Sequence, residues 1–413
     1  MPGDDPIPEQ PPTSPDKWLI ISLLAAAELL AMSLWFSATA VVPALMDHWQ
    51  VSSGQAAWLT MSVQLGFVAG AVASALFNIA DLLSPRIVFA FGAFSGAALN
   101  AAIPALDTGF VPSVALRFGT GMSLALVYPV GMKIMATWTR KNRGLGIGLL
   151  VGALTVGSAS PHLVKAFGEI TAWRPVLYSV SGLALAGGLL GLAVGHLGPY
   201  RTTVPRFRWR YMRKALTDRS LRLANFGYLG HMWELYAMWT WIPLFLAQAY
   251  ATARLGARAA AVAAFAVIAV GGSGSVLAGR LADRWGRTRT TILSMIVSGT
   301  CALTVGIFFH GHPVAVTLIA LIWGFAIVAD SAQFSTAISE LAEPEYMGTQ
   351  LTAQTAMGFL LTIGSIQLIP RLVEAAGWRW TFAVLALGPA LGCWAMWLLQ
   401  RSPEARKLAG GRG

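Results

Sequence analysis

Long apolar runs constrain the fold of this chain more than any other feature of its sequence. A helix needs about 20 residues to cross the roughly 30 Å of hydrocarbon in a bilayer. Twelve such runs follow one another, near residues 18–44, 55–80, 87–106, 112–138, 144–167, 175–197, 223–248, 258–280, 290–309, 313–338, 348–370 and 379–400. Because backbone polar groups in lipid must be satisfied within the protein, we expect an all-α membrane protein with twelve transmembrane helices.

The distribution of positive charge indicates how these helices are oriented. A net charge of +11 would suggest a nucleic-acid partner in a soluble protein, but only 11% of the residues are charged, against roughly a quarter in soluble domains. Lys and Arg cluster in segments 140–143, 201–222, 280–289 and 401–412, which fall on one side when the helices alternate. The positive-inside rule assigns that side to the cytoplasm. We therefore expect a multi-pass protein of the cytoplasmic (inner) membrane, with both termini cytoplasmic and no nucleic-acid partner.

The sequence repeats itself at about half its length. The segment Glu28–Trp35 matches Glu234–Trp241 at five of eight positions, with an offset of 206 residues. Asp81 and Asp283, Gly144 and Gly348, and the pairs at 173–174 and 378–379 recur at offsets of 202, 204 and 205. A parallel repeat relates the two halves by an axis along the membrane normal. The predicted division is a cytoplasmic tail (1–17), a six-helix bundle (18–197), a cytoplasmic linker (198–222), a second six-helix bundle (223–400) and a cytoplasmic tail (401–413).

Two cytoplasmic loops carry a related pattern. Residues 279–287 read Gly-Arg-Leu-Ala-Asp-Arg-Trp-Gly-Arg, and the loop after the second run keeps Asp81 and Arg86. An acidic group near a helix terminus and flanking arginines can form charge-assisted bonds between neighbouring helices. The segment 279–287 resembles the G-x-L-a-D-r-x-G-r loop of the major facilitator superfamily of secondary transporters. We expect a gating role for Asp81, Arg86, Gly279, Asp283, Arg284, Gly286 and Arg287; the alternative is that the arginines only fix topology.

The resemblance covers essentially the whole chain and implies a fold and a mode of action. In that family two pseudo-symmetric six-helix bundles rock against each other, and the first, fourth, seventh and tenth helices line a central cavity that opens alternately to the two sides. Residues 117–121 resemble an R-x-x-x-G element linked to proton coupling. The glycines of the fifth run resemble an antiporter motif, although Gly157 and Pro161 are not adjacent as in that motif. Small residues at such spacing also serve close helix packing.

Few ionisable residues lie within the apolar runs. A charge near the bilayer centre costs about 3 kcal/mol on insertion scales, which makes such groups functional candidates by default. Glu28, Glu234, Asp330 and Arg117 fall in the first, seventh, tenth and fourth runs, where the family places its cavity. We expect these four residues to serve proton coupling. The alternative is that they form ion pairs within one half and only fix its packing.

Side chains on the same helices are candidates for binding a solute. On the seventh run Gly227, His231, Glu234, Met238 and Trp241 recur at helical spacing, as do Glu28, Met32, Trp35 and Thr39 on the first. On the fourth run Tyr128 shares a face with Arg117, whereas Lys133 is turned roughly 160° away from it. We favour Lys133 as the solute-facing or pairing group and Arg117 as structural or coupling. The predicted substrate-binding residues are Lys133, Tyr128, Trp35, His231, Tyr236, Met238, Trp241 and Gln333; helix packing is the alternative role for such stripes.

Together these features predict a proton-coupled secondary active transporter of a small organic or anionic solute. One alternative is a proton/drug antiporter that exports amphipathic compounds, and another is a membrane sensor or scaffold that does not transport. The sequence contains no G-x-x-x-x-G-K-[ST] loop, which argues against ATP drive. We expect no enzyme activity, no catalytic residue, no metal and no cofactor. The expected partners are a small-molecule substrate, protons and the lipid bilayer, and the chain is expected to be a monomer.

Overall fold

A computed structural model describes residues 15–77, 79–107, 109–139, 143–168, 172–200 and 208–413, and these residues form helices and no strands. The first half contains α1 (Pro15–Met32), α2 (Ser37–Ala40), α3 (Val42–Trp49), α4 (Ser53–Ala56), α5 (Trp58–Leu76), α6 (Ile79–Leu82), α7 (Pro85–Leu106), α8 (Phe110–Leu124), α9 (Tyr128–Trp138), α10 (Arg143–Phe167) and α11 (Trp173–Val194).

The connecting segment contributes two short helices, and the second half follows. Its helices are α12 (Trp209–Met212), α13 (Lys214–Thr217), α14 (Arg219–Thr252), α15 (Ala257–Trp285), α16 (Arg287–Thr304), η1 (Val305–Phe308), α17 (Pro313–Ala329), α18 (Ser331–Leu341), η2 (Pro344–Tyr346), α19 (Met347–Ala376), α20 (Trp378–Thr381), η3 (Phe382–Ala386), α21 (Leu387–Gln400) and η4 (Pro403–Gly410).

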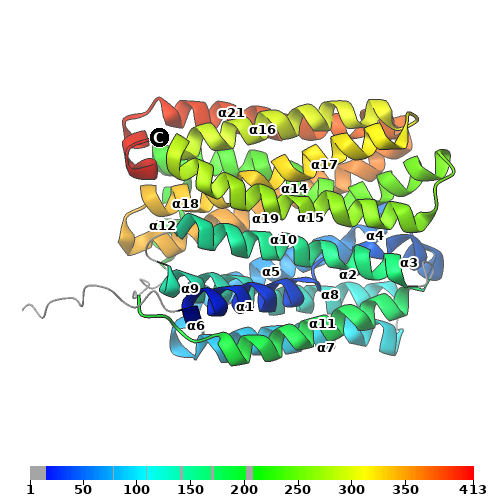
Figure 1. The fold of residues 1–413 in the computed structure, drawn as a ribbon, viewed down its shortest axis with the longest axis horizontal. Helices are drawn as coiled ribbons and strands as arrows, with labels where there is room; N and C mark the ends of the chain where they lie inside the picture. The colour runs from blue at the N-terminus through cyan, green and yellow to red at the C-terminus, as the bar shows by residue number, and fades with distance from the viewer. Residues whose placement is uncertain (1–14, 78, 108, 140–142, 169–171, 201–207) are drawn as a thin grey trace, which may run out of the picture.

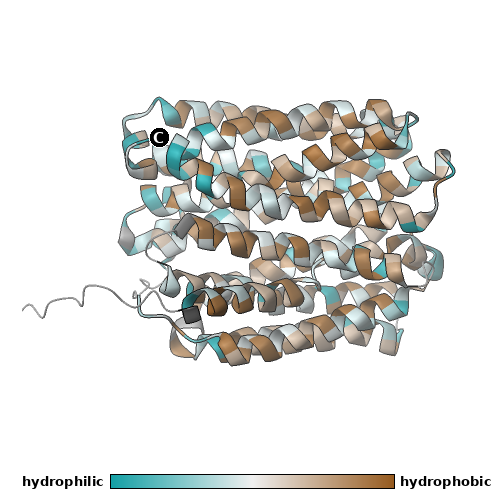
Figure 2. Cartoon of the chain, in the orientation of Figure 1, coloured by the Kyte–Doolittle hydropathy of each residue, from teal (hydrophilic) through white to brown (hydrophobic). Residues whose placement is uncertain are grey.

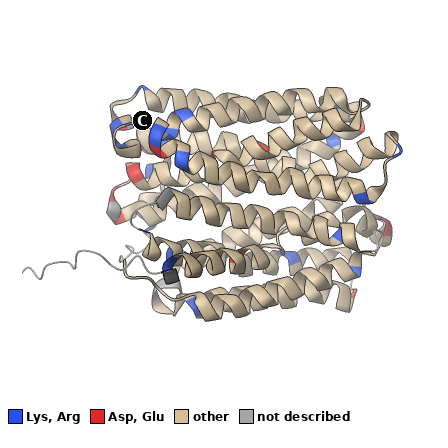
Figure 3. Ribbon diagram, viewed as in Figure 1, with Lys and Arg blue, Asp and Glu red and all other residues tan. Residues whose placement is uncertain are grey.

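The two halves lie against each other as two bundles of roughly parallel helices. Figure 1 shows α1–α11 in one bundle and α14–α21 in the other, with α12, the start of α1 and the C-terminus all at the same end of the molecule. Apolar residues run along the helices and hydrophilic ones gather at their ends (Figure 2). Most Lys, Arg, Asp and Glu also lie at the ends (Figure 3). This is the arrangement of a multi-pass membrane protein.

Ten helical segments in the described part of the chain are long and apolar enough to span a membrane. They correspond to ten of the predicted runs, and the two that remain are the first and the seventh. The first is broken into α1, α2 and α3, and α1 carries Glu28. The seventh, α14, is 34 residues long but includes His231 and Glu234. Polar side chains therefore lower the apolarity of these two helices, and the fold is consistent with twelve spans.

Three of the four helices expected to line a cavity are interrupted near their middle. The first span breaks between α1 and α2, the fourth between α8 and α9, and the tenth between α17 and α18 at Asp330. Pro129 lies in the first turn of α9, where a residue without an N–H is tolerated. A continuous helix over the fourth run was assumed in comparing the faces of Arg117 and Lys133, and the break between α8 and α9 lies between these two residues.

Glycines bring the two halves together along α10 and α15. A Cβ added to Gly152 would lie 3.2 Å from the carbonyl oxygen of Gly272, and one added to Gly148 would lie 3.2 Å from that of Ser275. Within the first half, a Cβ on Gly157 would lie 2.3 Å from the carbonyl oxygen of Leu29. These backbones approach closely because the residues are small. The glycines of the fifth span therefore serve close helix packing, as the simpler of the two interpretations predicted.

Candidate functional site

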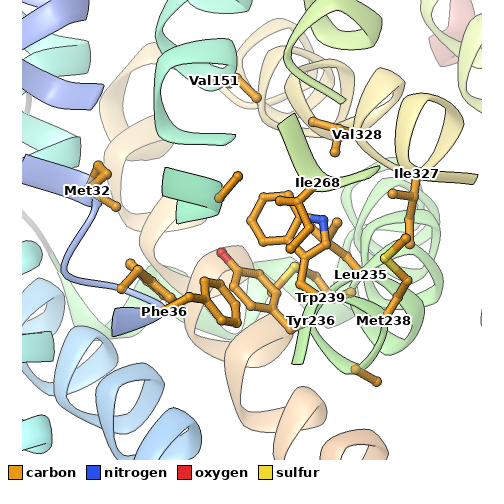
Figure 4. Close-up of a cluster of buried hydrophobic side chains, with 14 of the residues drawn as sticks. Met32, Phe36, Val151, Leu235, Tyr236, Met238, Trp239, Ile268, Ile327 and Val328 are labelled. Carbon is orange, nitrogen blue, oxygen red and sulfur yellow. The ribbon is translucent and has the colours of Figure 1, made fainter. Parts of the chain in front are cut away.

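Aromatic side chains from both halves meet in the middle of the molecule. Phe36 stacks on Tyr236 with ring centroids 6.2 Å apart, and Trp35 lies 5.5 Å from Phe359. Phe67 and Trp239 complete the group, each within 5.3–5.7 Å of a ring of the opposite half. Figure 4 shows Phe36, Tyr236 and Trp239 side by side. We call Trp35, Phe36, Phe67, Tyr236, Trp239 and Phe359 the aromatic cluster.

Three polar groups at or near the aromatic cluster are buried without a hydrogen-bond partner among the described residues. They are Nε1 of Trp35, Nε1 of Trp239 and Nε2 of Gln64. All three are N–H donors. A buried donor without an acceptor costs about 1–3 kcal/mol, so such groups mark a place where a ligand or water with acceptor oxygens would be stabilised.

Two hydrogen bonds join the two halves beside the aromatic cluster. They lie on the side of the cluster that is further from α12. Thr362 donates its hydroxyl to Oε1 of Gln64 at 2.7 Å, and Nε2 of Gln367 donates to the carbonyl of Gly54 at 3.0 Å. The positive-inside rule predicts that the end of the molecule where α12 lies faces the cytoplasm. The bonds hold the two halves together toward the opposite end from α12, which we call the outer side of the aromatic cluster.

Arg117 holds the break in the first span. Its fully buried guanidinium donates to the carbonyls of Leu34 and Trp35, at 2.9 and 2.5 Å, and to that of Leu59 at 3.1 Å. It also donates to the Ser37 hydroxyl at 2.9 Å and, at 3.3 Å, to Asn100. The break between α1 and α2 frees carbonyls from helical bonding, and Arg117 satisfies them. The structure thus places Arg117 in a fixed framework of the first half.

Glu28 is fully buried in the first half, against α9. A Cβ added to Gly131 would lie 2.4 Å from Oε2 of Glu28, so the carboxyl occupies the space above that glycine. Neither carboxyl oxygen has a hydrogen-bond partner among the described residues. Tyr128, at the start of α9, interacts electrostatically with Glu28 and with Tyr228 of the other half. Glu28 is therefore a buried carboxyl without a hydrogen-bond partner among the described residues. Tyr128 is the residue that connects it to the second half.

Glu234, the repeat partner of Glu28, has a different environment. Its Oε2 accepts a hydrogen bond from Ser298 at 2.8 Å, and its Oε1 accepts one from the Trp323 indole at 2.7 Å. Both donors belong to the second half, on α16 and α17. Glu234 thus points into its own bundle, and the duplicated sequence gives one unpartnered and one doubly bonded carboxyl.

His231 and Asp330 are brought together inside the second half. Nδ1 of His231 lies 2.9 Å from Oδ1 of Asp330, and Nε2 lies 2.9 Å from the hydroxyl of Ser331. Both members of the pair are almost fully buried. They link α14 to the break between α17 and α18, so this contact matches the predicted alternative of a pair within one half.

The remaining predicted binding residues are divided among several environments. Trp35 and Tyr236 belong to the aromatic cluster, whereas Met238 lies beside Ile327 on the far side of α14 (Figure 4). Trp241 donates its indole N–H to the carbonyl of Ile366 at 3.0 Å. Gln333 accepts a hydrogen bond from Arg287 at 2.9 Å. Tyr128 and Lys133 lie half-buried on α9, which residues 125–127 separate from α8 and Arg117.

Comparison with known proteins places this architecture in a family. The sequence model of the Major Facilitator Superfamily matches residues 24–367. The chain belongs to this superfamily. Its members are transporters rather than enzymes, so the expected fold of two six-helix bundles and the expected absence of enzyme activity agree with the family.

Two curated superfamily relatives and two solved structures are similar to this chain. The "Probable L-galactonate transporter" of Escherichia coli (strain K12) is 25% identical over 50% of the chain and 52% of its own length. The "Lincomycin resistance protein" of Streptomyces lincolnensis is 27% identical over 39% of the chain and 33% of its own length. The chain thus matches about half or less of the length of these relatives.

The structure of the proton:xylose symporter XylE has a TM-score of 0.68 at 15% identity, covering 92% of this chain and 95% of that one. The nucleoside transporter NupG has a TM-score of 0.67 at 16% identity, covering 92% and 99%.

The superfamily loop motif of the second half forms a bonded network at the junction of α15 and α16. Arg287 contacts Asp283 and Glu340, each at 3.0 Å, and donates to Gln333. These bonds connect α15 and α16 with α18 in the same half. Gly286 has φ +100° between α15 and α16, a conformation that favours glycine. The C-terminal segment packs on this network, because the backbone N–H of Ala409 donates to Glu340 at 3.0 Å.

The other predicted gating residues are not part of this network. Arg284 and Arg86 are exposed, and Gly279 is buried in α15. Asp81 lies in α6, and its side chain is outside the described residues, as are Arg140 and Lys141. In the first-half loop the structure therefore describes no counterpart to the Arg287 network.

Sequence reasoning missed most of the aromatic cluster. Phe36, Phe67, Trp239 and Phe359 were not predicted, because the predicted binding stripe of the seventh span follows the face that carries Glu234. The opposite face of the same helix carries Tyr228, Met232, Tyr236 and Trp239 at helical spacing, and it is this face that meets the first half. An aromatic stripe on the side away from the buried carboxylate was the signal that could have identified it.

Proposed function

We propose that this chain is a proton-coupled secondary active transporter that moves a small oxygen-rich organic solute, of the sugar-acid class, across the cytoplasmic membrane. The observation that carries the proposal is the aromatic cluster between the halves, with its three unpartnered N–H donors. Both termini of the chain and the basic linker would face the cytoplasm, as the positive-inside rule predicts.

The chemistry of the aromatic cluster favours a solute with an apolar face and several acceptor oxygens. Aromatic rings offer large flat surfaces for stacking, against which the C–H face of a sugar-like solute fits. The indole N–H groups of Trp35 and Trp239 and the amide of Gln64 can each donate to a hydroxyl or carboxylate oxygen. Three of the similar proteins are a galactonate transporter, a xylose symporter and a nucleoside transporter, whose solutes fall within this range.

We propose Glu28 as the residue that carries the coupled proton. An ionised carboxylate buried without partners is costly, and Glu28 has no partner among the described residues. Its neighbour Tyr128 interacts electrostatically with Tyr228 of the second half, so a change in the contact between the halves would reach the Glu28 carboxyl. Glu234 and Asp330 would instead hold the second half together through their fixed contacts.

Alternating access would come from rocking of the two halves about the glycine contact between α10 and α15. The outer hydrogen bonds of Gln64 and Gln367 join α5 and α4 to α19 and would break when the outer side opens. The Arg287 network lies within one half, and we propose that it keeps α18 in place as the cytoplasmic side opens and closes.

Uptake into proteoliposomes tests this proposal. With the outside acidic, we expect accumulation of at least one sugar acid from a panel of L-galactonate, D-gluconate, D-xylose, uridine and lincomycin. Trp239→Leu should abolish uptake, whereas Trp394→Leu, a matched change at an exposed lipid-facing tryptophan, should not. If no member of the panel moves, or if Trp239→Leu transports like the parent, the assignment of the aromatic cluster as the solute site is wrong.

A second candidate function is export of amphipathic compounds by proton exchange. It is favoured by the similarity to the lincomycin resistance protein and by the largely apolar character of the aromatic cluster. The same experiment separates the two. An exporter would expel lincomycin from vesicles against its gradient and leave sugar acids unmoved.

A further inference from the structure

A small cavity lies between the halves on the outer side of the aromatic cluster. Its volume is about 60 Å³, and it is lined from the first half by Thr39, Thr60, His162 and Lys165 and from the second half by Thr240 and Ala261, among others. This is room for a few water molecules, or for one compact polar group. We call it the outer cavity.

Basic side chains line the outer cavity. His162 and Lys165 are the ionisable side chains among its described lining residues, which include no Asp or Glu. Thr39 and Thr60 bond to each other at 2.7 Å, and Thr240 donates to the carbonyl of Tyr236 at 2.6 Å. Thr240 and one of the Thr39–Thr60 pair thus use their O–H donors within the protein, whereas the other hydroxyl of the pair and the two basic side chains can donate to a ligand.

The two basic residues are arranged to act together. They are three residues apart on α10, so they lie on one face of the helix. His162 is 1% exposed, and its Nε2 has no hydrogen-bond partner among the described residues. One turn further toward the aromatic cluster on this face, the buried hydroxyl of Ser158 is also unpartnered among them. Buried polar groups normally have a hydrogen-bond partner, and a bound ligand would supply one for His162 and Ser158.

From this geometry we infer that the outer cavity is a second binding site, which takes the carboxylate of a small organic anion arriving from outside. This inference deepens the proposed function and rests on it for the identity of the anion. A carboxylate has two oxygens, so one can accept from Nε2–H of His162 while the other accepts from the Lys165 ammonium. The volume suits the carboxylate group, and the rest of the solute would lie toward the outer surface.

The position of the outer cavity makes this site sensitive to the movement of the halves. The α2, α5 and α10 walls move with the first half, and the α14 and α15 walls move with the second. When the outer side opens, the cavity would widen toward the aromatic cluster, and Ser158 lies on the side of His162 that faces the cluster. The site would therefore bind the anion before it reaches the central aromatic side chains.

Binding can be measured without transport, by thermal unfolding of the purified full-length chain. Sodium acetate is the probe, and sodium chloride at equal ionic strength is the reference. A ligand that binds only the folded state raises the unfolding temperature as its concentration exceeds Kd. We expect a saturable rise with acetate beyond that with chloride, and an apparent affinity at least ten-fold weaker in Lys165→Gln and in His162→Gln.

Two further variants make the result decisive. Ala261→Leu should fill the outer cavity and remove the acetate effect while leaving both basic residues in place. Arg371→Gln removes an exposed positive charge at the outer end of α19 and should bind acetate like the parent. The inference is overturned if acetate and chloride act alike on the parent, or if all four variants respond equally. If acetate binding follows the expected pattern but no solute is transported, the site stands and the proposed function fails.

Discussion

Loss of the Arg117 guanidinium should destabilise the first half more than any other single change to a basic residue. Arg117→Met removes five hydrogen bonds, three of them to backbone carbonyls of α5 and of the break in the first span. The Trp35 carbonyl, in the break, would lose its charged donor, and the carbonyls of Leu34 and Leu59 would keep the longer bonds from Ser37 and Ser62.

The size of the effect follows from these bonds. Hydrogen bonds to a charged group contribute roughly 1.5–3 kcal/mol each in soluble proteins, but side-chain bonds within membrane proteins average only about 0.6 kcal/mol. Replacing Arg117 also relieves the cost of burying its charge, so the lower value is the appropriate one. Five bonds at that value give a loss of about 3 kcal/mol.

Equilibrium unfolding in mixed detergent micelles measures this quantity. Arg117→Lys keeps the charge but offers three donors in place of five, so its loss should be intermediate. Arg284→Met, at an exposed arginine, should change stability by less than about 0.5 kcal/mol. An Arg117→Met protein as stable as the Arg284→Met control would refute the view that Arg117 holds the broken span.

Three other predictions follow from individual contacts. Gly152→Leu should abolish transport without preventing membrane insertion, because a side chain there meets the backbone of α15 at 3.2 Å; normal uptake by this variant would contradict the packing argument. Hydrogen bonds from His48 and Arg174 hold the pKa of Asp107, at the end of α7, below its usual value. The stability that this provides is present above the ordinary Asp pKa near 4 and is lost as pH falls through the lowered folded value, so Asp107→Asn should flatten the acid limb of a stability–pH curve. That change should be small, since surface ion pairs contribute at most about 1 kcal/mol, and identical acid limbs would count against it. Trp323→Phe removes one of the two donors to Glu234 and should cost about 1 kcal/mol of stability or more while leaving proton-driven uptake measurable; complete loss of coupling would assign the proton to Glu234 instead.

The overall architecture was accessible from the sequence because it depends on long-range averages. Apolar runs, the repeat at about 204 residues and the motif at 279–287 each involve many residues, and errors at single positions do not change them. The family and its two-bundle fold were therefore predicted correctly.

The details of the site were less accessible, because helix breaks and side-chain partners depend on tertiary contacts. A helical wheel across the fourth span assumed one continuous helix, but α8 and α9 are separate, so the angle between Arg117 and Lys133 was not the relevant quantity. The break between α1 and α2 is stabilised by Arg117 from 83 residues away along the chain. No local pattern at Leu34 or Trp35 indicates such a partner.

The repeat suggested that Glu28 and Glu234 have similar surroundings, but the residues around the two carboxyl groups differ. Glu28 and Glu234 occupy equivalent positions, yet Ser298 and Trp323 donate to Glu234, whereas Gly131 offers Glu28 only space. Identical residues at equivalent positions predict equivalent depth. Their chemistry is decided by neighbours on other helices, which the repeat does not preserve.

The proton-carrying role of Glu28 is the central claim, and a paired transport assay tests it most directly. In proteoliposomes, Glu28→Gln should retain counterflow of the transported solute, because the aromatic cluster is intact, but should lose uphill accumulation driven by a pH gradient. Glu234→Gln should retain at least part of that accumulation. If Glu28→Gln still accumulates solute in proportion to the pH gradient, as the parent does, Glu28 does not carry the proton and the account is wrong.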